Sequence, residues 1–232
     1  MNILAIDTSA QVAGVCILNE TAVLSEFSVN NKLTHSQTLM PMMEAALSCA
    51  KLTFSDVDAF AVSVGPGSFT GIRIGVSAVK GLAFAAGKPC IPVSTLEALA
   101  HNVNADGMIC AAMDARCGQV YNALFWQNAG TLSRLCADRA ISIKDLGADL
   151  LKFDENIFLV GDGADLCYNG LGSENPAIRQ VPIHLKLQRA SSVGLVALEQ
   201  LRAEKSCSAA ELMPVYLRLP QAERELLKRQ KG

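Results

Sequence analysis

Three short segments carry residue types that could bind a phosphate or another anion. Each segment follows an apolar run and combines small, hydroxyl or carboxylate residues. Backbone N–H groups in a tight turn, or at the N-terminus of a helix, can together surround an anion. The candidate residues are Asp7, Thr8 and Ser9 in the first segment, Gly65, Gly67 and Ser68 in the second, and Gly161 and Gly163 in the third.

Each segment also has a purely structural interpretation. Asp, Thr and Ser favour turns in which the side chain bonds to its own backbone. Residues 65–71 have the spacing G-x-G-x-x-x-G and are not followed by Gly-Lys-Ser or Gly-Lys-Thr. The segment is therefore neither a dinucleotide fingerprint nor a Walker loop. A strand-to-helix turn and an anion site both remain open at this stage.

Residue types that form the common catalytic centres are not grouped in the sequence. His35, His101 and His184 are scattered, and no H-x-x-x-H, H-E-x-x-H or G-x-S-x-G pattern occurs. Eight cysteines are present without a C-x-x-C pair, and most lie in apolar runs. We therefore expect structural thiols, no catalytic residue, no metal ligand and no cofactor.

Composition narrows the class of protein further. Half of the 232 residues are hydrophobic, 18% are charged and the formal net charge is −2. These values predict a sizeable core and give no sign of the basic excess typical of nucleic-acid binders. No apolar run is as long as we would require for a membrane span, and Asp7 comes too early for a signal peptide. We expect a cytoplasmic protein.

The order of expected elements repeats itself along the chain. An apolar strand that ends in Asp opens each half, at Asp7 and again at Asp114. The repeated βββαβα pattern predicts an α/β fold of two domains, residues 1–105 and 106–232; two unrelated halves are the alternative. Expected strands are 2–7, 12–18, 21–29, 59–64, 90–93, 109–114, 119–126, 131–137 and 157–160, and expected helices are 36–51, 71–86, 95–103, 142–152 and 191–204.

Two of these helices are more apolar than burial on one side requires. The helix at 71–86 has one face with Ile72, Val76, Val79 and Ala83 and another with Ile74, Ala78, Leu82 and Ala85. We interpret the two faces as contacts with the domain sheet and with a second protein; a pair of core helices is the alternative. The predicted partner interface is Leu39, Met40, Met43, Leu47, Ile72, Val76, Val79 and Ala83. Glu at Val79 or Met43 should then abolish binding without unfolding the protein.

Five stretches together resemble one family. They read ILAIDT at 3–8, GPGSFTGIRIG at 65–75, PVSTL at 92–96, MDAR with VY at 113–121, and PVYLR at 214–218. The chain is similar to the TsaB (YeaZ) family over nearly its full length, with little family signal at 128–190. The resemblance implies a two-domain actin-like fold of the actin/Hsp70/sugar-kinase superfamily. In that superfamily the first turn supplies phosphate ligands, and its Asp can hold a metal ion through water.

The resemblance also implies a function. A TsaB-like protein partners its paralogue TsaD, and with the ATPase TsaE the pair transfers a threonylcarbamoyl group from threonylcarbamoyl-AMP to the adenosine beside the tRNA anticodon. Thr95 and Leu99 stand where TsaD has two metal-binding histidines, and neither side chain replaces imidazole. We therefore expect a non-catalytic activator that binds TsaD. Alone, it should form a homodimer through the same patch and hydrolyse ATP weakly or not at all.

Some alternatives stay open. The chain could instead be an independent ATPase of the superfamily or a glycoprotease-like metallopeptidase. Whether the cleft binds nucleotide does not follow from the sequence. The basic tail after residue 217 could touch RNA phosphate, although a solvated terminus explains its charges equally well.

Overall fold

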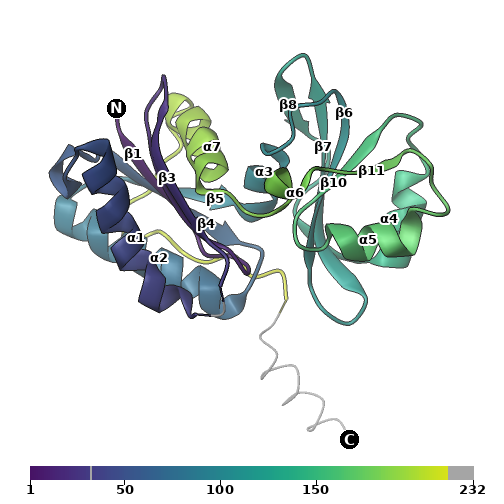
Figure 1. The fold of residues 1–232 in the computed structure, drawn as a ribbon, viewed down its shortest axis with the longest axis horizontal. Coiled ribbons are helices and arrows are strands. Elements are labelled where there is room, and N and C mark those ends of the chain that lie inside the picture. Colours follow the sequence, from purple (N-terminus) through teal and green to yellow (C-terminus); the bar gives the residue numbers. More distant parts are fainter. Residues whose placement is uncertain (32, 219–232) are drawn as a thin grey trace, which may run out of the picture.

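The computed structural model describes residues 1–31 and 33–218. The first half builds a five-stranded sheet in the order β3-β2-β1-β4-β5 (Figure 1). Its central strand β1 pairs antiparallel with β2 and parallel with β4. The strands are β1 (Ile3–Asp7), β2 (Ala13–Leu18), β3 (Val23–Val29), β4 (Ala59–Gly65) and β5 (Cys90–Ser94).

The second half repeats this strand order. Its sheet runs β11-β10-β6-β7-β8, and β9 also pairs with β7. Read from β8, the order matches that of the first sheet, and the central strand β6 ends at Asp114 as β1 ends at Asp7. The structure therefore confirms the predicted repeat. The strands are β6 (Gly107–Asp114), β7 (Gln119–Asn128), β8 (Thr131–Arg134), β9 (Arg139–Ser142), β10 (Ile157–Val160) and β11 (Ile178–Gln180).

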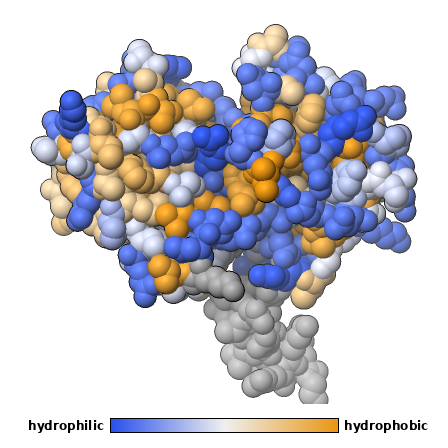
Figure 2. Space-filling model, in the orientation of Figure 1, coloured by the Kyte–Doolittle hydropathy of each residue, from blue (hydrophilic) through white to orange (hydrophobic). Residues whose placement is uncertain are grey.

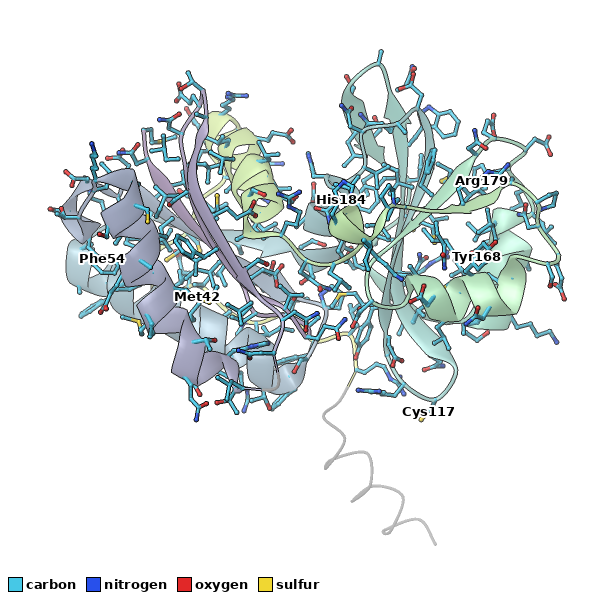
Figure 3. All side chains as sticks on the ribbon, in the orientation of Figure 1. Met42, Phe54, Cys117, Tyr168, Arg179 and His184 are labelled. Carbon is cyan, nitrogen blue, oxygen red and sulfur yellow. The ribbon has the colours of Figure 1, made fainter. Side chains whose placement is uncertain are left out.

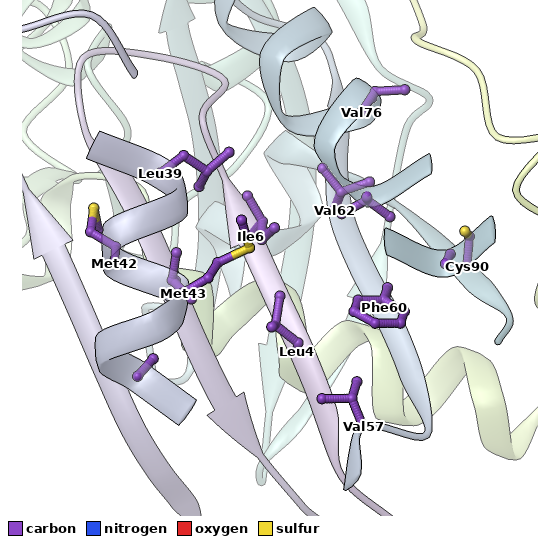
Figure 4. Packing of buried hydrophobic residues seen from close by; sticks show 14 of the residues in the cluster. Leu4, Ile6, Leu39, Met42, Met43, Val57, Phe60, Val62, Val76 and Cys90 are labelled. Carbon is purple, nitrogen blue, oxygen red and sulfur yellow. The ribbon is translucent and has the colours of Figure 1, made fainter. Parts of the chain in front are cut away.

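Helices cover both faces of the first sheet. The helices α1 (His35–Ala50) and α2 (Phe69–Ala86) pack on one face, where Met43 and Val76 meet Ile6 and Val62 of the strands (Figure 4). Both faces of β1 and β2 are apolar, so the other face must also be covered. The helix α7 (Ala190–Arg202) covers it and faces the second half (Figure 1).

The position of α7 corrects the predicted second domain. Residues 106–232 were assigned to one unit, but α7 packs its Val193 and Ala197 against Ile3 and Leu18 of the first sheet. Farther along, the backbone of Cys207 forms an antiparallel β-bridge with the backbone of Cys90 in β5, through two N–H to carbonyl bonds of 2.9 Å. The chain therefore leaves the first sheet, builds the second and returns, because the apolar second face of the first sheet needs a helix.

Shorter helices surround the second sheet. The helix α3 (Thr95–Ala100) packs on one face, and α4 (Ile143–Leu150) and α5 (Ala164–Leu171) pack on the other. The short helix α6 (Ile183–Lys186) leads toward α7, and a 3₁₀ turn η1 (Phe54–Asp56) precedes β4. Sequence analysis did not predict α5, α6, β9 or β11, and the strand expected at 131–137 ends at Arg134.

The ends of α2 are set by specific residues. The helix was expected from residue 71, but it begins at Phe69 and Ser68 is its cap, whose Oγ accepts the N–H of Gly71 at 3.2 Å. Gly87 ends the helix in the left-handed conformation. By length and composition, α2 could cross a membrane, which sequence analysis had excluded. One face of this helix, which includes Ile72 and Val79, is buried against the sheet, and 33% of the helix is buried in all.

Candidate functional site

A cavity of about 600 Å³ lies where the two halves face each other. The turn after β1, the loop after β4, the end of β6 and the segment 215–218 line it. Of the predicted anion-binding residues, Ser9, Gly67 and Ser68 line the cavity. The others lie behind its wall and are Asp7, Thr8, Gly65, Gly161 and Gly163.

The Asp7 carboxylate accepts hydrogen bonds from other groups of the protein. It is buried, and its Oδ1 accepts the backbone N–H and the hydroxyl of Ser9 at 2.8 and 2.6 Å. Its Oδ2 accepts the hydroxyl of Ser63 at 2.6 Å. Burial raises the pKa of Asp7, while these hydrogen bonds oppose the rise. The carboxylate is buried and does not line the cavity, so it does not face a water molecule there.

The turn after β1 and the loop after β4 close on each other. The hydroxyl of Thr8 donates to the carbonyl of Gly71 at 2.7 Å, and the N–H of Ser68 donates to the carbonyl of Ser9 at 2.6 Å. At Gly67 a Cβ atom would collide with that same Ser9 carbonyl, so glycine permits the close approach. The Ser68 N–H, which an anion would need, is therefore already bonded within the protein.

The third predicted segment is also a packing turn. Gly161 has φ +106°, which favours glycine, and its N–H donates to the Lys186 carbonyl at 2.7 Å. The N–H of Gly163 donates to the carbonyl of Ala112 at 3.0 Å. The two glycines hold this turn against the end of β6.

Asp162 stands between these glycines and lines the cavity, although it was not among the predicted site residues. Within residues 1–31 and 33–218, its buried Oδ1 has no hydrogen-bond partner. Burial raises the pKa of Asp162 to about 6, and the nearby Asp114 adds to the rise. Its place at the centre of a Gly-Asp-Gly turn was the sequence signal that could have identified it.

Residues 215–218 join the two halves across the cavity. The N–H of Val215 donates to the carbonyl of Val64 at 2.8 Å, and Arg218 donates to the carbonyl of Ala115 at 2.6 Å. The ring of Tyr216 lies 4.8 Å from that of Phe69. This segment is the PVYLR stretch of the family resemblance. The rest of the basic tail lies outside the described residues, so the hypothesis of an RNA contact stays a prediction.

The predicted partner interface needs a correction at the level of residues. Seven of its eight side chains are buried in the core of the first half: Leu39, Met43, Leu47, Ile72, Val76, Val79 and Ala83. They pack on the sheet, so they cannot meet a second protein. Glu at Val79 or Met43 should unfold the domain, contrary to the expectation above. Met40 is the exception, because 42% of it is exposed.

The other apolar face of α2 points outward. Ile74, Ala78 and Leu82, spaced four residues apart, are half-buried, and Phe84 is 83% exposed. Hydrophobic surface spreads over the lobe of Figure 2 that contains α1 and α2. We call Met40, Ile74, Ala78, Leu82 and Phe84 the outer face.

Metal-binding groups do not gather in the part of the chain that the structure describes. Within residues 1–31 and 33–218, no cluster of three or more His, Cys, Asp and Glu side chains could hold a metal ion. Thr95 and Leu99, at the positions of the TsaD histidines, are both buried where α3 meets the sheets.

Comparison with known proteins gives consistent results. The family model for TsaD, tRNA N6-adenosine threonylcarbamoyltransferase, matches residues 23–226. The tRNA threonylcarbamoyladenosine biosynthesis protein TsaB of Bacillus subtilis is 33% identical over 239 residues and covers 100% of both chains. The TsaB protein of Haemophilus influenzae is 30% identical over 235 residues and covers 94% of each.

A solved structure agrees with these relatives. YeaZ from Pseudomonas aeruginosa is 28% identical, with a TM-score of 0.77 over 93% of this chain and 99% of that chain. This likeness supports the actin-like α/β fold that the family resemblance implies. With a full-length TsaB relative at 33% identity, this chain belongs to the TsaB (YeaZ) family of tRNA threonylcarbamoyladenosine biosynthesis proteins.

Proposed function

We propose that this protein is a non-catalytic subunit that binds and activates TsaD, and with it TsaE. The complex would transfer the threonylcarbamoyl group from threonylcarbamoyl-AMP to the anticodon-adjacent adenosine of tRNA. In this role the protein works in the cytoplasm, carries no cofactor of its own and meets tRNA through the complex. The TsaD family model that matches most of the chain supports a paralogous partner.

The outer face of α1 and α2 carries the proposal. A soluble monomer rarely exposes a large contiguous apolar patch, and such patches commonly mark protein contacts. Here α2 exposes the ring of Phe84 and, on another side of the same helix, the half-buried stripe of Ile74, Ala78 and Leu82. Met40 adds a flexible apolar side chain from α1, of the kind that adapts to a partner surface.

The alternative activities gain no support from the described residues. A nucleotide hydrolase needs a base or a polar group to orient the attacking water, and Asp7 is bonded to Ser9 and Ser63. A metallopeptidase needs a ligand set, and Thr95 and Leu99 are buried away from the cavity. We therefore favour the activator over an independent ATPase or glycoprotease-like peptidase.

A charge on the outer face tests the proposal. The Met40→Glu, Phe84→Glu double variant should bind TsaD about 100-fold more weakly, because the carboxylates would be buried unpaired in the complex. Reconstituted tRNA modification should fall in parallel. Leu195→Glu is the matched control, because Leu195 is 43% exposed on α7, on the other side of the sheet. It should bind like the wild type.

The isolated protein gives a second readout. A paralogue with similar helices implies that the same patch can pair with its own copy around a two-fold axis. Analytical ultracentrifugation should show a wild-type dimer and a monomeric double variant. If the double variant is folded and still binds TsaD and supports modification, the outer face is not the interface.

A further inference from the structure

Two of the eight cysteines lie directly opposite each other in the fold. Cys90 opens β5, and Cys207 follows α7 at the point where the chain returns to the first sheet. The two residues form an antiparallel bridge in which each N–H donates to the carbonyl of the other at 2.9 Å. Residues opposed in this way have Cα atoms about 5.5 Å apart. Disulfides span Cα separations of about 4.4–6.8 Å, so the backbone spacing suits one.

Both side chains lie on the same face of the sheet. Cys90 is buried in the core that α1 and α2 form with this face (Figure 4), and the half-buried Cys207 packs against the same core. Directly opposed residues have Cβ atoms about 4.5–5.5 Å apart, and a disulfide needs about 3.5–4.5 Å. The two Cβ atoms must therefore approach by about 1 Å. Because Cys207 belongs to an isolated bridge and not to a continuous strand, its backbone can make this shift.

Other cysteines of the chain have different surroundings. Cys16 and Cys110 lie within strands and are opposed there by other residue types. Cys49 on α1 is exposed, and so is Cys117, which lies at the outer end of the turn between β6 and β7 (Figure 3). Cys49 and Cys117 therefore provide exposed thiols with which the bridged pair can be compared.

The surroundings of the pair set the order in which the two thiols react. Burial raises the pKa of Cys90 to about 11, and the neighbouring Cys207 adds to the rise. Burial and Glu211 also raise the pKa of Cys207, while the cation of Lys80 opposes the rise at both thiols. Both are therefore protonated at neutral pH and react slowly. Cys207 is the more accessible thiol, with exposed residues on either side, so a small oxidant reaches it first.

We propose that Cys90 and Cys207 form a reversible disulfide when the protein meets a small peroxide oxidant such as hydrogen peroxide. The sulfur of Cys207 attacks one peroxide oxygen, the O–O bond breaks, and Cys207 becomes a sulfenic acid while one water molecule leaves. The sulfur of Cys90 then attacks the sulfur of Cys207, the S–O bond breaks, and the departing hydroxide takes the proton of Cys90 to form a second water molecule. Two thiols are oxidised to one disulfide, and one peroxide is reduced to two water molecules.

The disulfide fastens the segment 207–218 to the first sheet. Lys80 of α2 already holds this segment, since its Nζ donates to the carbonyls of Ala210 and Leu212 at 3.2 and 3.1 Å. The segment then crosses the cavity between the two halves. A covalent bond at Cys207 closes the long stretch of chain that leaves β5, builds the second half and returns. Closing so long a loop restricts the unfolded chain and stabilises the folded one.

Peptide mapping of the full-length protein tests the proposal. The reduced protein is treated with hydrogen peroxide, free thiols are blocked with iodoacetamide, and tryptic peptides are identified by mass spectrometry without reduction. We expect a pair of peptides joined through Cys90 and Cys207, which dithiothreitol releases. In Cys90→Ala the oxidation should stop at Cys207, so dimedone should label its sulfenic acid at least about tenfold more than in the wild type.

Thermal unfolding gives an independent readout. Oxidation should raise the midpoint of the wild type by about 5 °C or more, and Cys207→Ser treated in the same way should show no rise. Oxidation of Cys49 and Cys117 reports that the peroxide has acted. The proposal is overturned if, after prolonged treatment has oxidised both exposed thiols of the still folded protein, Cys90 can be alkylated once denaturant is added. A disulfide between Cys207 and a different cysteine would also overturn it.

Discussion

The two halves of the molecule end their first strands with the same residue type, yet they use it differently. Asp7 is buried and accepts hydrogen bonds from Ser9 and Ser63. Asp114 is half-buried, lines the cavity and contacts the side chain of Arg116 at 3.3 Å. In the first half the aspartate at the strand end is buried and holds neighbouring groups by hydrogen bonds. In the second half the aspartate at the same place lines the cavity. Duplication therefore preserves the strand order more strictly than the chemistry at the strand ends.

The helix after the strand that pairs parallel with the central strand also differs between the halves. In the first half this helix is α2, with 18 residues, and in the second half it is α5, with 8 residues. The longer helix covers its sheet with one face and carries a second apolar face outward. The first half, in which the residues after β1 are hydrogen-bonded within the protein, is therefore also the half that presents the proposed partner surface.

The largest expected effect comes from a charge on the buried face of α2, which tests whether that face belongs to the core. Val79→Glu should destabilise the protein by about 4 kcal/mol or more, because the carboxylate would lie unpaired in the core. Ser77→Glu, two residues away on the exposed side, should leave stability within about 0.5 kcal/mol of wild type. Urea unfolding monitored by circular dichroism measures both. A folded Val79→Glu protein of normal stability would place the inner face outside the core.

Sequence reasoning predicted the repeat well, because each half opens on an apolar strand ending in Asp. It could not assign α7 to a sheet, since the apolar face of a helix does not say which distant strands it covers. It missed α5, whose eight residues, Ala164–Leu171, include Gly170 and are too few for a clear helical period. Local patterns predict elements, and non-local packing decides where those elements go.

The candidate site was predicted less completely. Of the residues predicted to bind an anion, only Ser9, Gly67 and Ser68 line the cavity, and most of the others make packing contacts. For α2, Val79 and Ala78 lie on two faces of similar hydropathy, so composition could not rank which face is buried. The Gly-Asp-Gly turn was a sequence signal for Asp162, but the lack of a hydrogen-bond partner for its buried Oδ1 among the described residues is visible only once its neighbours are known.

Removing the carboxylate at the end of β1 and at the end of β6, in separate variants, tests whether Asp7 and Asp114 play different structural roles. Asp7→Ala should cost about 3 kcal/mol, because it leaves the buried hydroxyl of Ser63 and the N–H of Ser9 without their acceptor. Asp114→Ala should cost about 0.5 kcal/mol or less, since it removes an exposed ion pair with Arg116. Urea unfolding at neutral pH compares them. Equal losses in the two variants would mean that both strand ends play the same structural role.

The smallest expected effect concerns Asp162, whose neighbourhood differs from that of Asp7 in lacking hydroxyl donors to its Oδ1 among the described residues. Its pKa of about 6 in the folded protein exceeds the ordinary value of 3.8. Between these pH values the folded state binds more protons than the unfolded state, so stability falls as pH rises from about 4 to about 6. Above that range the ionised carboxylate lowers stability by a constant amount.

Asp162→Asn keeps the shape of the side chain and removes this titration. The variant should therefore be more stable than wild type by about 1 kcal/mol at pH 7, and the difference should shrink as pH falls and vanish below about pH 3, where Asp162 is protonated in both states. Asp7 and Glu26 also titrate with shifted pKa values, but they are common to both proteins and cancel in the difference. Urea unfolding of the pair across this pH range measures it. If the difference in unfolding free energy between the two proteins does not change with pH, Asp162 has the same pKa in the folded and unfolded states. Asp162 and Asp7 would then differ only in how they are packed.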